Sequence, residues 1–188
     1  MRKATVSLFL LACFILSAFA FMPDNSGIFI ASNGSVAFVS KAPLETIKAE
    51  SKKLGGALDA SKRTFAFVLP VSSFEGFNSP LQKEHFNENY LETDKIPKAI
   101  FKGKIIEEVN LAAPGTYTIR AKGTMSIHGV DKEMIIKSKV TTAASQMAVE
   151  SSFTITLKDF NIYIPKLVNQ KIAEDIFVDV KMDLSPKK

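Results

Sequence analysis

The strongest constraint on the fold is a twelve-residue alternation of apolar and polar side chains at residues 116–127. Tyr117, Ile119 and Met125 fall on one face, whereas Thr118 and Lys122 fall on the other. Successive side chains of a β-strand point to opposite faces, so a period of two predicts a long strand with one buried and one solvated face. Such a strand needs paired neighbours to be stable.

Weaker forms of the same alternation recur along the chain and predict about eight strands. They lie at residues 36–40, 46–51, 64–69, 100–106, 134–141, 153–158 and 176–183, in addition to 116–127. Short turns at residues 58–62, 128–132 and 143–146 favour antiparallel hairpins over crossover connections. The predicted fold class is all-β. Its apolar face is buried either against a second sheet or by closure into a barrel, and closure also removes exposed strand edges.

One segment is predicted to be helical. Ser79 is a suitable N-cap, Pro80 suits the first helical position, and Gln82 can complete a capping box. Four residues then fall on one broad side of this short amphipathic helix: Leu81, His85, Phe86 and Tyr90. A single helix beside a sheet is expected to plug or cover it.

The first twenty residues have the pattern of a secretory signal peptide. Arg2 and Lys3 precede an apolar run that ends in the small-residue pattern of residues 18–20, which predicts cleavage after Ala20. Cys13 offers a second interpretation, a lipoprotein signal with this residue lipidated. We therefore expect a periplasmic or secreted protein with one domain at residues 21–188.

Charge gives little reason to expect a nucleic-acid partner. The formal net charge of the chain is +5, and it falls by two when Arg2 and Lys3 are removed. The remaining basic residues are interspersed with acidic ones rather than clustered. Cys13 is the only cysteine of the sequence, so cleavage after Ala20 leaves no thiol chemistry.

The interior of an eight-stranded barrel is either filled by side chains or holds one small ligand. Ala121 and Gly123 are small residues in the longest inward row and are expected to leave room; the alternative is that Gly123 marks a bend and Ala121 packs beneath a ring. The predicted ligand-binding residues are uncharged: Phe65, Phe67, Phe86, Tyr90, Phe101, Ile119, Ala121, Gly123, Met125, Ile136, Phe153, Ile155 and Val178. Such a lining favours an apolar chain.

No motif in the sequence predicts catalysis, a metal or a cofactor. A nucleophile elbow, a phosphate-binding glycine loop and a zinc-protease helix are all absent from it. His85 and Glu88 have a spacing that could present two metal ligands, but a solvated helix face explains them better. His128 lies in a predicted turn. We expect no catalytic residue, no metal site and no cofactor.

Two ordered segments resemble the YceI-like family. The first comprises residues 74–77, 81–93 and 97–103, and the second runs from residue 123 to 133, where a strand leads into His128 and Gly129. The resemblance implies a periplasmic or secreted, lipocalin-like antiparallel barrel whose lumen holds an isoprenoid or another long-chain lipid, without enzymatic activity. The N-terminal part departs from the family pattern because the chain has no Trp, and residues 33–38 take the place of the usual first strand.

Three hypotheses of function follow. The first is an exported protein that carries an apolar lipid chain in its lumen. The second is a solidly packed barrel that acts as a protein-interaction module or homodimer through outward apolar residues, namely Val68, Ile135 and Phe177. The third is a lipid-modifying enzyme that uses His85 or His128.

Overall fold

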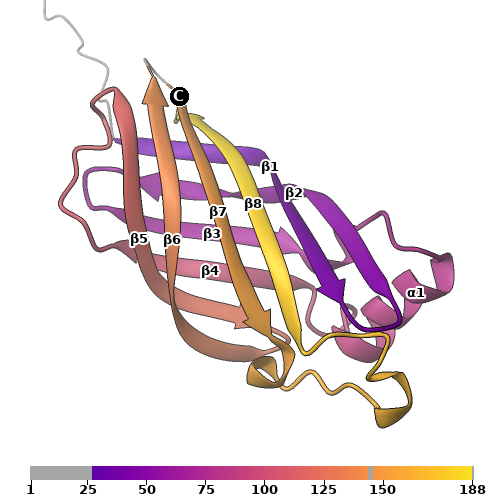
Figure 1. Ribbon diagram of the computed structural model, residues 1–188. Helices are drawn as coiled ribbons and strands as arrows, with labels where there is room; N and C mark the ends of the chain where they lie inside the picture. The colour runs from indigo at the N-terminus through magenta and orange to yellow at the C-terminus, as the bar shows by residue number, and fades with distance from the viewer. Residues whose placement is uncertain (1–26, 144–145, 188) are drawn as a thin grey trace, which may run out of the picture.

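The computed structural model describes residues 27–143 and 146–187, so the predicted signal peptide and Cys13 lie outside the described residues. Eight strands form a closed barrel in which each strand pairs with its neighbours in the chain and β1 pairs with β8 (Figure 1). The strands are β1 (Ile28–Lys41), β2 (Thr46–Asp59), β3 (Thr64–Pro70), β4 (Lys98–Ile105), β5 (Gly115–Ile127), β6 (Val130–Ala143), β7 (Gln146–Thr156) and β8 (Asp175–Pro186). All pairings are antiparallel, which confirms the predicted fold class.

The first two strands are longer than the sequence predicts. Their pairing register shifts between Ala31 and Gly34 and again between Gly34 and Val36, so β1 carries a bulged region that interrupts the alternation of side chains. A Cβ atom at Gly34 would come within 2.8 Å of Met182 on β8, because the bulge brings β1 close to that strand. The bend that β1 shows in Figure 1 follows from this irregularity.

The hairpin between β5 and β6 is tighter than the predicted turn of residues 128–132. It consists of His128 and Gly129, whose φ angles of 51° and 74° both lie in the left-handed region. Two-residue hairpins with positive φ at both positions match the twist of the flanking strands. The strand predicted at residues 153–158 also ends earlier, because residues 157–160 form a 3₁₀-helix, η3 (Leu157–Phe160).

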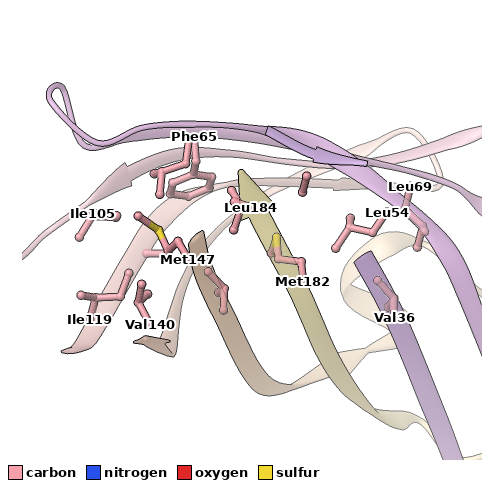
Figure 2. Close-up of a cluster of buried hydrophobic side chains, with 14 of the residues drawn as sticks. Val36, Leu54, Phe65, Leu69, Ile105, Ile119, Val140, Met147, Met182 and Leu184 are labelled. Atoms are coloured by element: carbon pink, nitrogen blue, oxygen red, sulfur yellow. The ribbon is translucent and has the colours of Figure 1, made fainter. Parts of the chain in front are cut away.

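The two ends of the barrel differ. At one end, Leu111 from the connection between β4 and β5 packs with Met147 and Leu184, and all three are fully buried. Figure 2 shows Met147 and Leu184 pointing from β7 and β8 toward Phe65. This end is closed by side chains. The longer connections lie at the other end, together with the helix α1 (Pro80–His85) (Figure 1).

Helix α1 begins with the predicted cap, Ser79 followed by Pro80, but the Gln82 side chain reaches back to Asn78 instead of to Ser79 as in a capping box. The Ser79 hydroxyl accepts a hydrogen bond from the Gln82 backbone N–H at 3.2 Å, and the Gln82 side chain accepts one from the Asn78 backbone N–H at 3.0 Å. The helix continues as one π-helical turn, η2 (Phe86–Tyr90). Among residues 27–143 and 146–187, no helix is long and apolar enough to cross a membrane.

The barrel wall separates between β6 and β7 toward the α1 end. Their pairing begins at Ala143 and Gln146 and stops at Ser138 and Ser151, although both strands continue (Figure 1). Helix η3 contacts both strands at this separation, where Phe160 is buried in a second apolar cluster. The wall is thus completed by a side chain from a connection rather than by backbone hydrogen bonds.

Candidate functional site: an apolar cavity in the barrel

A cavity of about 590 Å³ occupies the barrel between its closed end and helix α1. This volume lies within the range of about 300–1,000 Å³ that is usual for small-molecule sites. Each of the eight strands contributes to its wall: Val36, Ile47, Phe65, Phe101, Ile119, Ile136, Val149 and Val178 are examples in strand order. Because the strands alternate, their polar residues point outward and the lining is predominantly apolar.

Twelve of the predicted ligand-binding residues line this cavity. They are Phe65, Phe67, Phe86, Tyr90, Phe101, Ile119, Ala121, Met125, Ile136, Phe153, Ile155 and Val178. The small side chain of Ala121 faces open space, which agrees with the prediction that the inward row of β5 leaves room. Their contact with a ligand stays a prediction.

Gly123 is not among the lining residues, and the prediction that it widens the lumen is wrong. It lies directly opposite Gly103 on β4. A Cβ atom at Gly123 would come within 2.3 Å of the Lys102 carbonyl oxygen and 2.9 Å of the Gly103 Cα. Gly123 therefore permits a close approach of two backbones, so a larger side chain there would disturb the strand pairing rather than fill the cavity.

Four phenylalanine rings gather at the mouth. The Phe86 ring from η2 stacks on Phe38 of β1, with ring centroids 5.6 Å apart, and lies 5.7 Å from Phe74 and 5.0 Å from Phe77. Phe38, Phe74 and Phe77 are absent from the predicted set of ligand-binding residues. Phe74 and Phe77 belong to the segment that carries the family resemblance. The sequence signal that could have identified them is the occurrence of two phenylalanines just before the capped helix.

Polar groups are concentrated at the mouth and along one side. Glu45 Oε1 accepts hydrogen bonds from Gln82 Nε2 at 3.0 Å and from Asn78 Nδ2 at 3.1 Å, which joins the turn between β1 and β2 to α1. Deeper in the wall, the hydroxyls of Ser138 and Ser151 are 2.7 Å apart and hydrogen-bond to each other. Paired in this way, the polar atoms leave an interior suited to hydrocarbon.

Burial raises the pKa of the Tyr90 phenol above its ordinary value. A phenol is already neutral at physiological pH at its ordinary pKa, and burial acts in the same direction, so the hydroxyl can donate a hydrogen bond beside the cavity.

The two histidines occupy different surroundings. The side chain of His85 is exposed at the mouth. The ring of His128 is nearly buried, with Nδ1 3.1 Å from the Phe160 carbonyl oxygen and Nε2 3.2 Å from Glu92 Oε2. These two contacts link the hairpin that holds His128 to two other connections at the α1 end. Within the part of the chain that the structure describes, no group of three metal-ligating side chains comes together.

The comparison with protein families decides the membership of this chain. The family model described as YceI-like domain matches residues 24–184, which include every strand but the last residues of β8. The chain belongs to the YceI-like family. The two segments that carry the resemblance meet in the fold of this YceI-like barrel, where His128 of the second contacts Glu92 of the first.

Solved structures share the YceI-like fold at low sequence identity. A polyisoprenoid binding domain from Saccharophagus degradans, implicated in plant cell wall breakdown, superimposes with a TM-score of 0.74 at 15% identity, covering 86% of this chain and 99% of that one. Burkholderia cenocepacia BcnA gives 0.66 at 16% identity, covering 80% and 95%. The Campylobacter jejuni YCEI protein gives 0.59 at 14% identity, covering 73% and 84%. A search among curated proteins found no match.

Proposed function

We propose that this YceI-like protein is an exported, non-enzymatic carrier that holds the apolar chain of a polyisoprenoid or a similar amphiphilic lipid in its barrel. The observation that carries the proposal is the cavity of about 590 Å³ with an apolar lining and a few polar side chains, such as Glu45 and Gln82, at its mouth. Each methylene group moved from water into such a lining contributes about 0.8 kcal/mol, so a long chain gains more than its ordering costs. The polyisoprenoid binding of the Saccharophagus domain supports the same ligand class.

The arrangement of the cavity also suggests how the ligand lies. The closed end at Met147 and Leu184 stops the chain, so the hydrocarbon tail occupies the interior and the polar head stays near Glu45 and Gln82. Export through the signal peptide at residues 1–20 would bring the carrier to the periplasm or the medium, where an apolar chain cannot travel unprotected.

The proposal is tested by measuring uptake of a long-chain polyprenol, with a matched pair of variants on β5. Ala121→Phe places a ring in the cavity, whereas Thr118→Phe adds the same ring to the outer face of the strand. Displacing two methylene groups of the ligand costs about 1.6 kcal/mol, so Ala121→Phe is expected to weaken binding at least about tenfold. Thr118→Phe is expected to bind like the original protein.

Val178→Phe gives a second filling variant from another strand of the wall, β8, in case one substitution disturbs folding. Native extraction followed by lipid mass spectrometry identifies the ligand that the protein carries when it is purified. An empty cavity after native extraction, together with no polyprenol uptake, would exclude the carrier function.

A second function is supported by two exposed apolar residues on the outer wall. Ile135 and Phe177 are 58% and 56% exposed, which suits a contact between two barrels. We propose a homodimer through this wall as the alternative to a solitary carrier. Phe177→Glu is expected to convert a dimer to a monomer in light scattering, and a monomeric mass of the unmodified protein at high concentration would exclude it.

A further inference from the structure

Exposed apolar side chains also gather around the mouth of the cavity. Leu167 is 95% exposed and Tyr163 is 73% exposed, both in the connection between β7 and β8. Leu44 in the turn between β1 and β2 and Leu81 in α1 are exposed too. These four residues, the mouth rim, come from three connections at one end of the barrel (Figure 1). Large apolar residues clustered on a surface mark a binding face.

Hydrogen bonds join these connections into one structure. The Leu44 backbone N–H donates to the Gln170 carbonyl oxygen at 2.8 Å, which links the first turn to the last connection. Glu45 links the same turn to α1 through Gln82. The last connection also contributes Val168 to the cavity wall, and Leu81 is both exposed and a wall residue. The last connection and α1 therefore each carry both exposed apolar residues and residues of the cavity wall.

The chemistry of the last connection favours a lipid surface as the partner. The connection, residues 157–174, contains Lys158, Lys166 and Lys171 together with Asp159 and Glu174, and the two acidic residues lie close to its ends, next to the strands. Its middle part, where Tyr163 and Leu167 lie, therefore carries only basic charge. Lysines above an apolar tip can pair with lipid phosphates while the tip enters the acyl boundary. Tyr163 has an apolar ring and a polar hydroxyl, a combination that is enriched where membranes meet water.

We propose that the mouth rim docks this protein on a lipid bilayer, with Tyr163 and Leu167 inserted and Lys166 and Lys171 at the phosphates. In that orientation the cavity faces the membrane, and an apolar chain passes between the two without crossing water. The inference rests on the proposed function for its cargo, but docking itself is measured independently of cargo.

The absence of Trp from the sequence allows a clean test. In the full chain as expressed and processed, Leu167→Trp places a single indole at the rim and Ile135→Trp places one on the outer wall. Vesicles of phosphatidylcholine and phosphatidylglycerol are expected to shift the rim indole's emission to the blue, and brominated lipid is expected to quench it. The wall indole should show neither effect. Equal responses from both positions, or no response at the rim, would overturn the proposal.

Vesicle co-sedimentation supplies a second measurement with matched variants. Tyr163→Ser combined with Leu167→Ser is expected to weaken binding at least about tenfold, because two apolar side chains are lost. Ile30→Ser combined with Ile106→Ser removes two exposed apolar side chains at the closed end of the barrel and should bind unchanged. Lys166→Gln combined with Lys171→Gln should cost about fivefold per lysine on anionic vesicles.

Docking and carriage can fail separately. Ala121→Phe is expected to keep vesicle binding while it loses polyprenol uptake. Vesicle binding by a protein that never takes up polyprenol would contradict the proposed function alone. If the original protein takes up polyprenol but its rim variants bind vesicles as well as it does, the docking surface alone is contradicted.

Discussion

Single residues of the same type have different roles in this barrel. Gly123 and Gly103 face each other and allow β4 and β5 to approach closely. Gly55 on β2 has more space, because an added Cβ atom would lie 3.5 Å from the nearest atom, the Ala31 carbonyl oxygen. The difference depends on the neighbouring strand and not on the local sequence.

Gly123→Ala is therefore expected to destabilise the fold by about 1–3 kcal/mol, because the new methyl group meets backbone that cannot move freely. Gly55→Ala is the control, and it should leave stability unchanged or raise it by about 0.5 kcal/mol by restricting the unfolded chain. Urea unfolding measures both free energies. Equal effects at the two positions would contradict the close-approach interpretation.

Glu92 makes the stability of the fold depend on pH. Hydrogen bonds from Lys95 and His128 hold the pKa of Glu92 below its ordinary value of 4.5. A lowered folded-state pKa stabilises the fold above the unfolded-state value, and this contribution is lost as the pH falls through the folded-state value.

We expect Glu92→Gln to make the unfolding free energy fall less steeply below about pH 5. The contribution is modest because the carboxylate is partly exposed. Unfolding titrations at several pH values measure the slope, with Glu88→Gln, an exposed acid on η2, as the control. A slope unchanged from that of the original protein would show that Glu92 does not act in this way.

At the scale of elements, η3 replaces missing strand pairing. β6 and β7 share no hydrogen-bonded ladder beyond Ser138 and Ser151, and the gap is covered by η3 with Phe160. Lys132 of β6 forms an ion pair with Asp159 of η3 at 3.1 Å, which ties the helix to the wall. The stability of this half of the barrel therefore depends on a few side chains.

Phe160→Ala is expected to cost about 3–5 kcal/mol and to speed amide exchange in residues 130–137 and 152–156, which flank the gap. Tyr163→Ala in the same connection is the control, because its ring is exposed and its loss should change stability by less than about 0.5 kcal/mol. Hydrogen exchange read by mass spectrometry resolves the two segments. Uniform acceleration across all strands would indicate global rather than local loosening.

The predictability of each element follows from how regular its pattern is. β5 and β8 alternate with little interruption, and their predicted and observed limits agree closely. β1 and β2 were predicted at less than half their lengths, because the bulge near Gly34 interrupts the period of two. α1 was predictable from its cap, which is a local interaction, whereas η3 forms against β6 and β7 and has no comparable local signal.

At the scale of the whole molecule, the alternation predicts which residues face inward but not where the interior is hollow. Met147 and Val149 share a face of β7, yet Met147 packs at the closed end and Val149 lines the cavity. The two residues differ because Leu111, from the connection between β4 and β5, packs with Met147 and fills the interior at that end. Phe74 and Phe77 were missed for the same reason, since they reach the mouth from a connection.

A hollow barrel and a packed barrel respond differently to the same substitution, and thermal unfolding distinguishes them. In a hollow barrel, the ring of Ala121→Phe fills empty space, so the ligand-free variant should be at least as stable as the original protein. The original protein with ligand at 100 times its Kd should gain about 2.7 kcal/mol, which is about 5–10 °C in Tm. The variant, whose affinity is at least about tenfold lower, should gain about 1.4 kcal/mol or less at the same ligand concentration. In a packed barrel, the added ring is overpacked and lowers Tm, and the lipid shifts neither protein. Thr118→Phe provides the reference, because its ring stays in solvent and should leave the ligand-induced shift intact.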